Sequence, residues 1–187
     1  MSSSEIDKIP LPIIDNVVEG YHATKKTHAE EALRKGSFHP SINPGDWLGH
    51  GTYFWENNPS HAIQWAYDNY GKDGGSVLKA SIMLGKCLDL SNGTLASIVK
   101  VAYDNLREEY NKKGKDLPIN DPNDPKNHRL DCAVMNKIPE VVEIDTIRAP
   151  FYEGDPIFPS SFLLTYSHIQ IVVLNPENII GEIQLYS

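Results

Sequence analysis

Residues 45–66, "GDWLGHGTYFWENNPSHAIQWA", place aromatic side chains between closely spaced glycines, in a chain with an aromatic content of only 9%. Glycine tolerates positive φ and therefore favours sharp turns ahead of "TYFW". Residues 52–55 combine β-branched and aromatic side chains, which is typical of a short strand. Asn58 before Pro59 predicts a helix N-terminus, and Gly71 predicts its end. We expect a turn, a strand and a helix in immediate succession.

The preceding sequence predicts another strand that leads directly into a helix. Residues 17–24, "VVEGYHAT", have the composition of a strand. Thr27 and Glu30 have the spacing of a capping box, and Gly36 is a typical C-terminal stop. Residues 37–50 are rich in Pro, Gly, Asn and Asp and are expected to form a loop.

The following sequence is richer in strands. Residues 76–84 alternate as a half-buried strand does, and residues 95–110 carry apolar side chains at helical spacing. The later segments predict, in order, a polar loop, a short helix, a strand, a long aromatic and Pro-rich loop and two closing strands, at 114–127, 128–138, 142–149, 150–166, 167–174 and 178–186. This order predicts an α+β fold rather than repeated βαβ units.

The length and composition suit a single globular domain. The chain has 187 residues, of which 40% are apolar and 22% charged. We expect an N-terminal arm at residues 1–14 and a domain at 15–187, with a variable helical and loop insertion at 91–144. No apolar run approaches the roughly 20 residues of a membrane span, and we see no secretory signal. A cytoplasmic protein without membrane contact is expected.

The charged residues and cysteines exclude some functions. A net charge of −8 gives no general attraction to nucleic acid. Lys112, Lys113 and Lys115 form a local basic cluster that keeps an RNA or DNA partner open. Cys87 and Cys132 show neither a disulfide framework nor zinc-like pair spacing. They indicate a reducing compartment, and we assign no metal ligand.

Three polar side chains are expected on three separate strands: His22 in "GYHAT", Tyr53 in "GHGTYFWE" and Gln170 in "SHIQIVVLNPENIIG". In this order and spacing they resemble the ADP-ribosyltransferases of the poly(ADP-ribose) polymerase and diphtheria-toxin type, which carry His, Tyr and Glu or a substitute. "FYEGDPIFP" also resembles a toxin-like bacterial branch. The resemblance covers roughly residues 18–90 and 145–183. It implies a single-domain fold of split, curved antiparallel β-sheets with flanking helices around an NAD cleft.

The resemblance also implies how NAD is bound. The backbone N–H and C=O of Ala23, where the family has Gly, would hold the nicotinamide carboxamide, and Thr24 would add a hydroxyl contact. His22 would bond a hydroxyl of the adenosine ribose. Tyr53 would stack on the nicotinamide ring, and Trp65 would cover its opposite face.

Gln170 departs from the family, which usually has Glu at this position. Glutamine keeps a hydrogen bond but loses the charge that stabilises the cationic ribose. Losing one such contact raises the barrier by roughly 2.7–4 kcal/mol. Glu153 and Asp155, in the loop before Gln170, are the alternative acids, and Glu153 could be the general base toward an acceptor. Gly51 would let the backbone approach the dinucleotide.

The resemblance implies a mono-ADP-ribosyltransferase that takes NAD as its substrate, releases nicotinamide and modifies a protein, RNA or DNA acceptor. Such an enzyme would act as a toxin or phage-defence effector, with a neutralising antitoxin as partner. Two alternatives stay open. One is an NAD glycohydrolase, which uses water as the acceptor. The other is a non-catalytic module that binds ADP-ribose or protein.

Each candidate residue also has a purely structural interpretation. His22 could be a core histidine at a strand end, and Tyr53 an ordinary strand aromatic. Gln170 could lie on a solvent-facing side of its strand. Trp55 is assigned to the core. Arg148 could bind an NAD phosphate or an acidic acceptor, or it could form a surface ion pair, and the ion pair is favoured.

Overall fold

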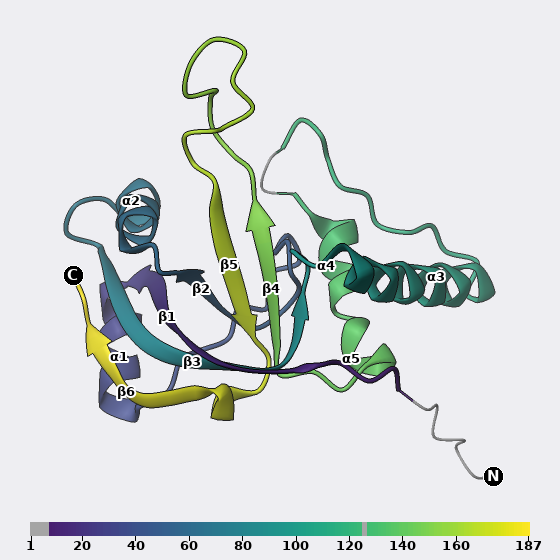
Figure 1. Ribbon diagram of the computed structural model, residues 1–187, viewed down its shortest axis with the longest axis horizontal. Coiled ribbons are helices and arrows are strands. Elements are labelled where there is room, and N and C mark those ends of the chain that lie inside the picture. Colours follow the sequence, from purple (N-terminus) through teal and green to yellow (C-terminus); the bar gives the residue numbers. More distant parts are fainter. Residues whose placement is uncertain (1–7, 125–126) are drawn as a thin grey trace.

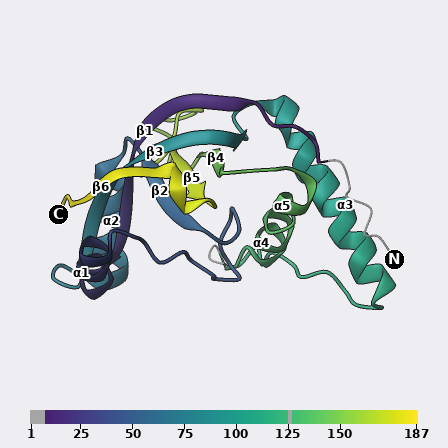
Figure 2. The same cartoon turned by 90° about the horizontal axis from the view of Figure 1, so that it is seen from below.

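The computed structural model describes residues 8–124 and 127–187, and within them the fold is α+β, as predicted. One strongly curved sheet runs through the molecule, with helices at both of its ends (Figures 1 and 2). Residues 1–7 of the expected N-terminal arm lie outside the described residues. The first strand begins at Ile13, so the end of that arm belongs to the sheet.

The sheet closes on itself through its pairings. β1 pairs with β2, β2 with β5, β5 with β4, β4 with β3, and β3 with β1, while β6 adds to β3. The strands are β1 (Ile13–Lys25), β2 (Thr52–Glu56), β3 (Gly75–Asp89), β4 (Thr146–Phe151), β5 (His168–Val173) and β6 (Ile179–Leu185).

The expectation of split, purely antiparallel sheets needs correction. The strands form one sheet, and β3 pairs with β4 in parallel. Parallel neighbours need a long crossover connection, which is supplied by the helical segment between them. That connection is the segment expected as an insertion at residues 91–144.

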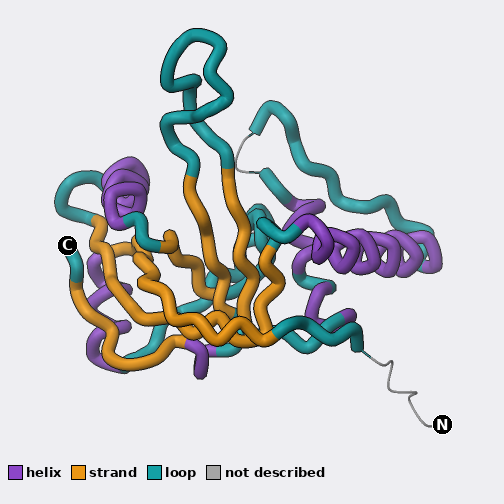
Figure 3. The backbone as a smooth tube through the Cα atoms, viewed as in Figure 1, coloured by secondary structure: helices purple, strands orange, loops and turns teal. Residues whose placement is uncertain are grey.

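The helices form two groups at opposite ends of the sheet (Figure 3). α1 and α2 lie at one end, where α1 contacts β3 and β6 and α2 contacts β1 and β3. The other three lie at the opposite end. The helices are α1 (Lys26–Lys35), α2 (Pro59–Tyr70), α3 (Ala96–Lys112), α4 (Arg129–Met135) and α5 (Ile138–Val141), with short 3-10 turns η1 (Gly93–Leu95) and η2 (Pro176–Asn178).

The α3–α5 segment is part of the main core. Apolar side chains of all three helices pack against β3, β4 and β5, where Leu88, Ile147 and Val172 are fully buried. A second core lies between β1, β2, β3 and β5, around Phe54 and Ile82. These three helices, which lie within the expected insertion, are therefore integral to the domain. No helix within the described ranges combines the length and apolarity needed to cross a bilayer.

Three of the four helix-end predictions are confirmed, including the end of α2 at Gly71. The His61 N–H donates to Asn58 Oδ1 over 3.0 Å at the start of α2, and Gly36 ends α1 with a φ of 68°. The capping box at Thr27 is wrong, because α1 already begins at Lys26 and its N-terminus has no side-chain cap. β1 stays paired with β3 through Lys25, so the strand runs into the helix without a turn.

The glycines ahead of β2 are required by packing within the protein. A Cβ on Gly51, where φ is 154°, would lie 2.4 Å from Val172 Cγ1 and 2.9 Å from the Val173 carbonyl oxygen. A Cβ on Gly49, where φ is 79°, would lie 2.8 Å from Asn136 Oδ1. β5 and the end of α4 therefore approach this turn too closely for a larger residue.

Candidate functional site

A cleft of about 420 Å³ opens at the end of β1 and β2, beside α2 and the loop that precedes β2. Seven of the residues predicted to bind NAD line it together: His22, Ala23, Thr24, Gly51, Tyr53, Trp65 and Gln170. They come from β1, β2, β5, α2 and the turn before β2. The fold thus brings segments from distant parts of the chain to one cavity.

His22 joins β1 to β2 through its side chain. Its Nδ1 lies 2.8 Å from the Tyr53 carbonyl oxygen, which can only accept, so Nδ1 carries the proton. Burial lowers the pKa of His22, and the ring packs 4.9 Å from Phe38 and 5.7 Å from Phe54 between centroids. The imidazole is therefore neutral at pH 7 and has an unprotonated Nε2.

Tyr53 is held by its hydroxyl and offers its ring to the cleft. The hydroxyl donates to the Gly49 carbonyl over 2.6 Å and accepts from the Leu48 N–H over 3.1 Å. Burial raises the pKa of Tyr53, so the phenol stays protonated. Since the hydroxyl is already paired with the preceding loop, the group available to a ligand is the aromatic face.

Gln170 faces the cleft rather than open solvent. On β5 it pairs with Trp55 of β2 on one side and with Ala149 of β4 on the other. Its Nε2 lies 3.1 Å from Nε2 of His168. Because His168 Nδ1 donates to the Tyr166 carbonyl over 2.9 Å, His168 Nε2 must accept from Gln170. The Gln170 carboxamide is thereby oriented by a buried histidine.

The two acids before β5 do not reach the cleft. Glu153 lines a neighbouring cavity with His61 and Trp65, and Trp65 borders both spaces. Asp155 is exposed and borders neither. Glu153 therefore lies next to the cleft that His22 and Tyr53 line, rather than inside it.

Aromatic rings form one wall of the cleft. Trp55 is 6% exposed and belongs to the core as expected, whereas Trp65 is 37% exposed, with its ring centroid 5.8 Å away. Tyr70 and Trp47 also line the cleft. Such a surface suits a flat heterocycle.

Asp46 is a cleft residue that the sequence did not reveal. It lies in the irregular loop before β2, where no periodicity marks an inward-facing side chain. Its Oδ2 is buried without a hydrogen-bond partner, and burial raises its pKa. An unpaired buried carboxylate oxygen is costly and is suited to accept a hydrogen bond from a ligand hydroxyl.

Arg148 does not line the cleft and is not part of a surface pair. Its Nε and Nη2 donate to the two Glu56 carboxylate oxygens over 2.5 and 2.9 Å, and Nη1 donates to Asp89 over 2.9 Å. The three side chains are only 10–17% exposed. This network links β2, β3 and β4. No described Lys or Arg lines the cleft, but Lys25 Nζ lies 6.0 Å from the ring centroid of Tyr70, which does line it.

The lysine cluster is largely neutralised. Lys112 pairs with Glu108 over 2.9 Å and Lys113 with Glu109 over 2.5 Å, in both cases one helical turn apart. Lys115 alone gives little attraction for a phosphate backbone.

Searches with this chain against protein-family models, curated proteins and solved structures give no match. The assignment of a function therefore rests on the cleft itself.

Proposed function

We propose that this chain is an NAD-dependent mono-ADP-ribosyltransferase with the fold of that family. The observation that carries the proposal is the convergence of His22, Tyr53 and Gln170 on one aromatic-walled cleft from three strands. A core histidine or an ordinary strand tyrosine would not require a shared cavity. The large ring surface and the small number of polar groups are typical of a ligand site.

The geometry suggests how NAD would be held. The unprotonated Nε2 of His22 would accept a hydrogen bond from a ribose hydroxyl. β1 pairs with β2 only through Gly20 and Tyr21, so on that side the backbone around Ala23 has no strand partner and is free to bond the carboxamide. Tyr53 and Trp65 would enclose the nicotinamide ring, and Lys25 lies near enough to the rim to approach a phosphate.

Gln170 would assist the chemical step by hydrogen bonding the nicotinamide ribose. The glycosidic C–N bond breaks, its electron pair leaves with nicotinamide, and positive charge develops on the ribose. An acceptor nucleophile then bonds to the ribose carbon and loses its proton. The neutral Gln170 amide orients the sugar without supplying charge, so we expect slow turnover.

The loop between β4 and β5 supports a macromolecular acceptor. It projects far from the sheet (Figure 1) and is ordered by backbone hydrogen bonds between its two arms, such as Tyr166 to Glu153 over 3.0 Å. Its exposed apolar side chains are Tyr152, Ile157, Phe158, Phe162, Leu163 and Tyr166. Such a surface, together with the acidic net charge, favours a protein acceptor. A cytoplasmic location and a neutralising antitoxin belong to the same proposal.

The experiment is transfer of label from adenylate-labelled NAD to a cell extract, followed by protease or nuclease digestion. Wild type is compared with Tyr53→Phe and Tyr53→Ala. Phe keeps the ring and should retain transfer, whereas Ala removes the stacking face and should abolish it. Label released by protease identifies a protein acceptor, and label released by nuclease identifies a nucleic acid.

Two outcomes would replace the proposal with one of its alternatives. Free ADP-ribose without labelled polymer indicates an NAD glycohydrolase. No nicotinamide release by folded wild type, together with saturable binding of ADP-ribose, indicates a binding module. Equal turnover by wild type and Tyr53→Ala would refute the proposed cleft.

A further inference from the structure

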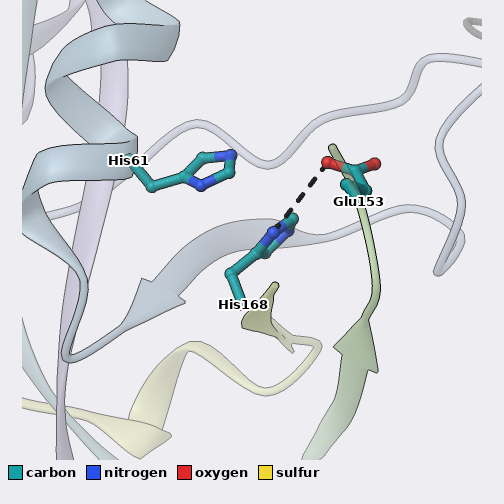
Figure 4. Close-up of side chains that lie close together, drawn as sticks. All are labelled: His61, Glu153 and His168. Atoms are coloured by element: carbon teal, nitrogen blue, oxygen red, sulfur yellow. Dashed lines mark ion pairs between the residues drawn. The ribbon is translucent and has the colours of Figure 1, made fainter. Parts of the chain in front are cut away.

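Three potential metal ligands meet beside the cleft, outside the groups proposed to contact NAD (Figure 4). His61 comes from the first turn of α2, Glu153 from the loop after β4, and His168 from the first residue of β5. One ligand atom from each lies within 4.8 Å of the other two. Three separate segments of the chain thus point donor atoms at one small volume.

Two of the three donor groups, the His61 ring and the Glu153 carboxylate, form no hydrogen bond with a described residue. His168 Nδ1, in contrast, donates to the Tyr166 carbonyl over 2.9 Å and would have to lose this proton to bind a metal. The proton would then lie on His168 Nε2, which would donate to the carboxamide oxygen of Gln170 after that amide turns over. Glu153 Oε2 lies 3.9 Å from His168 Nδ1. That separation is too long for a hydrogen bond. A direct ion pair would also need a protonated His168, whose side chain is only 2% exposed. The cluster leaves carboxylate and imidazole close together but unconnected.

Aromatic contacts hold the two imidazoles in place. The His61 ring stacks on Trp55 with centroids 5.6 Å apart, and His168 stacks on Phe151 at 5.5 Å. The two imidazole centroids are 4.2 Å apart. The His61 side chain is half-buried against Trp55, an environment that favours the neutral ring over the imidazolium cation. Neutral imidazole is the form that binds metals.

We propose that His61, Glu153 and His168 bind one divalent transition-metal ion, with zinc as the best match. Two histidines and one glutamate form a known catalytic zinc ligand set, with bond lengths of about 2.0–2.2 Å. Tetrahedral bonds of that length place ligand atoms roughly 3.4 Å apart, so the donors must close by about 1.4 Å at most. Glu153, with its side chain 37% exposed on a loop, has the freedom to make this movement.

The remaining coordination position faces a cavity of about 670 Å³ lined by His61 and Glu153. It is therefore open to water or to another ligand. The ion would fasten the projecting β4–β5 loop to α2. It would also touch the cleft indirectly, because His168 bonds to Gln170. The site stands on its own geometry and does not depend on the proposed transferase activity.

The test is metal binding by chelator-treated full-length protein, measured by calorimetry with Zn²⁺ and by the visible spectrum of added Co²⁺. Wild type should bind one ion per chain. His61→Asn and Glu153→Gln should each weaken Zn²⁺ binding by at least roughly 10- to 100-fold, because both remove a ligand and a loss of that size is typical even when only a residue supporting a ligand is changed. The exposed His50, remote from the cluster, provides the control His50→Asn, which should bind as wild type does.

Circular dichroism would verify that each variant is folded, and Glu153→Gln preserves the shape of a side chain that is only partly buried. Failure of wild type to bind one Zn²⁺ saturably would overturn the site. So would unchanged affinity in folded His61→Asn and Glu153→Gln. Because the readout is binding, loss of transferase activity alone neither supports nor refutes it.

Discussion

Replacing Arg148 with Met tests whether the Arg148 network holds the sheet together. Methionine keeps an unbranched apolar stem of similar length but removes the guanidinium. The variant leaves the Glu56 and Asp89 carboxylates without their shared cation, at side-chain exposures of 10% and 17%. Removing one partner of a buried ion pair costs about 3–5 kcal/mol. Because some water reaches this site, we expect a loss near 3 kcal/mol.

Urea unfolding followed by circular dichroism measures the effect. With a slope of about 2 kcal/mol per molar urea, a loss of about 3 kcal/mol lowers the midpoint by roughly 1.5 M. The matched control is Lys112→Met, because Lys112 and Glu108 form an ion pair with side chains 73% and 67% exposed. Exposed pairs contribute about 0–1 kcal/mol, so the control should move the midpoint by less than about 0.5 M.

Equal midpoint shifts for Arg148→Met and Lys112→Met would refute this reasoning. That result would mean that burial gives the network no energetic advantage over a surface pair. A changed slope in either variant would require the free energies of unfolding to be compared instead of midpoints.

Four further predictions concern the turn, the cleft and the projecting loop. Gly51→Ala should lose about 1–3 kcal/mol more unfolding free energy than Gly36→Ala, because only Gly51 lacks space for a Cβ; denaturant titration of both checks this. Burial lowers the pKa of His22 in the folded protein, so below about pH 6.5 the unfolded chain binds a proton at His22 more readily than the folded one. The free energy of unfolding of wild type should therefore fall as the pH is lowered through that range. It should fall less for His22→Gln, which urea midpoints measured at several pH values would show. Gln170→Glu places a negative charge near the ribose and should raise the rate of nicotinamide release by about 10²-fold. An unchanged or lower rate would contradict the role assigned to this position. Phe162→Ser, at a fully exposed position, should reduce label transfer to protein while nicotinamide release continues. An equal loss of both activities would mean that Phe162 affects the cleavage of NAD rather than the binding of the acceptor.

Local features of the fold were predictable where one short segment determines them. Asn58 and Gly36 act on their own helix ends, so the sequence identifies them correctly. Thr27 fails because the pairing of Lys25 with Gly75, distant in the chain, carries β1 directly into α1. The parallel pairing of β3 with β4 likewise depends on how the intervening helices fold back, which no local pattern specifies.

The residues of the candidate site likewise differ in how far the sequence predicts them. His22 and Tyr53 lie in short segments with distinctive turns, so their strands could be recognised, although only the structure shows that Gln170 joins them in a cavity. The sequence did not single out His61. It named Glu153 and Arg148 as candidates but did not indicate that Glu153 lies beside two histidines or that Arg148 bridges two carboxylates. Their partners are distant in sequence, and a histidine on a helix or an arginine on a strand has many possible neighbours until the sheet closes.

The position of β5 between β2 and β4 determines when the cleft can exist. During synthesis, β1, β2 and α2 leave the ribosome long before β5, because chains grow from the N-terminus at about 5–20 residues per second. The nascent chain can therefore place His22 beside Tyr53 while the position of Gln170 is still empty. Any activity that needs all three residues must wait until the C-terminal strands have inserted, and an unfinished chain would lack that activity.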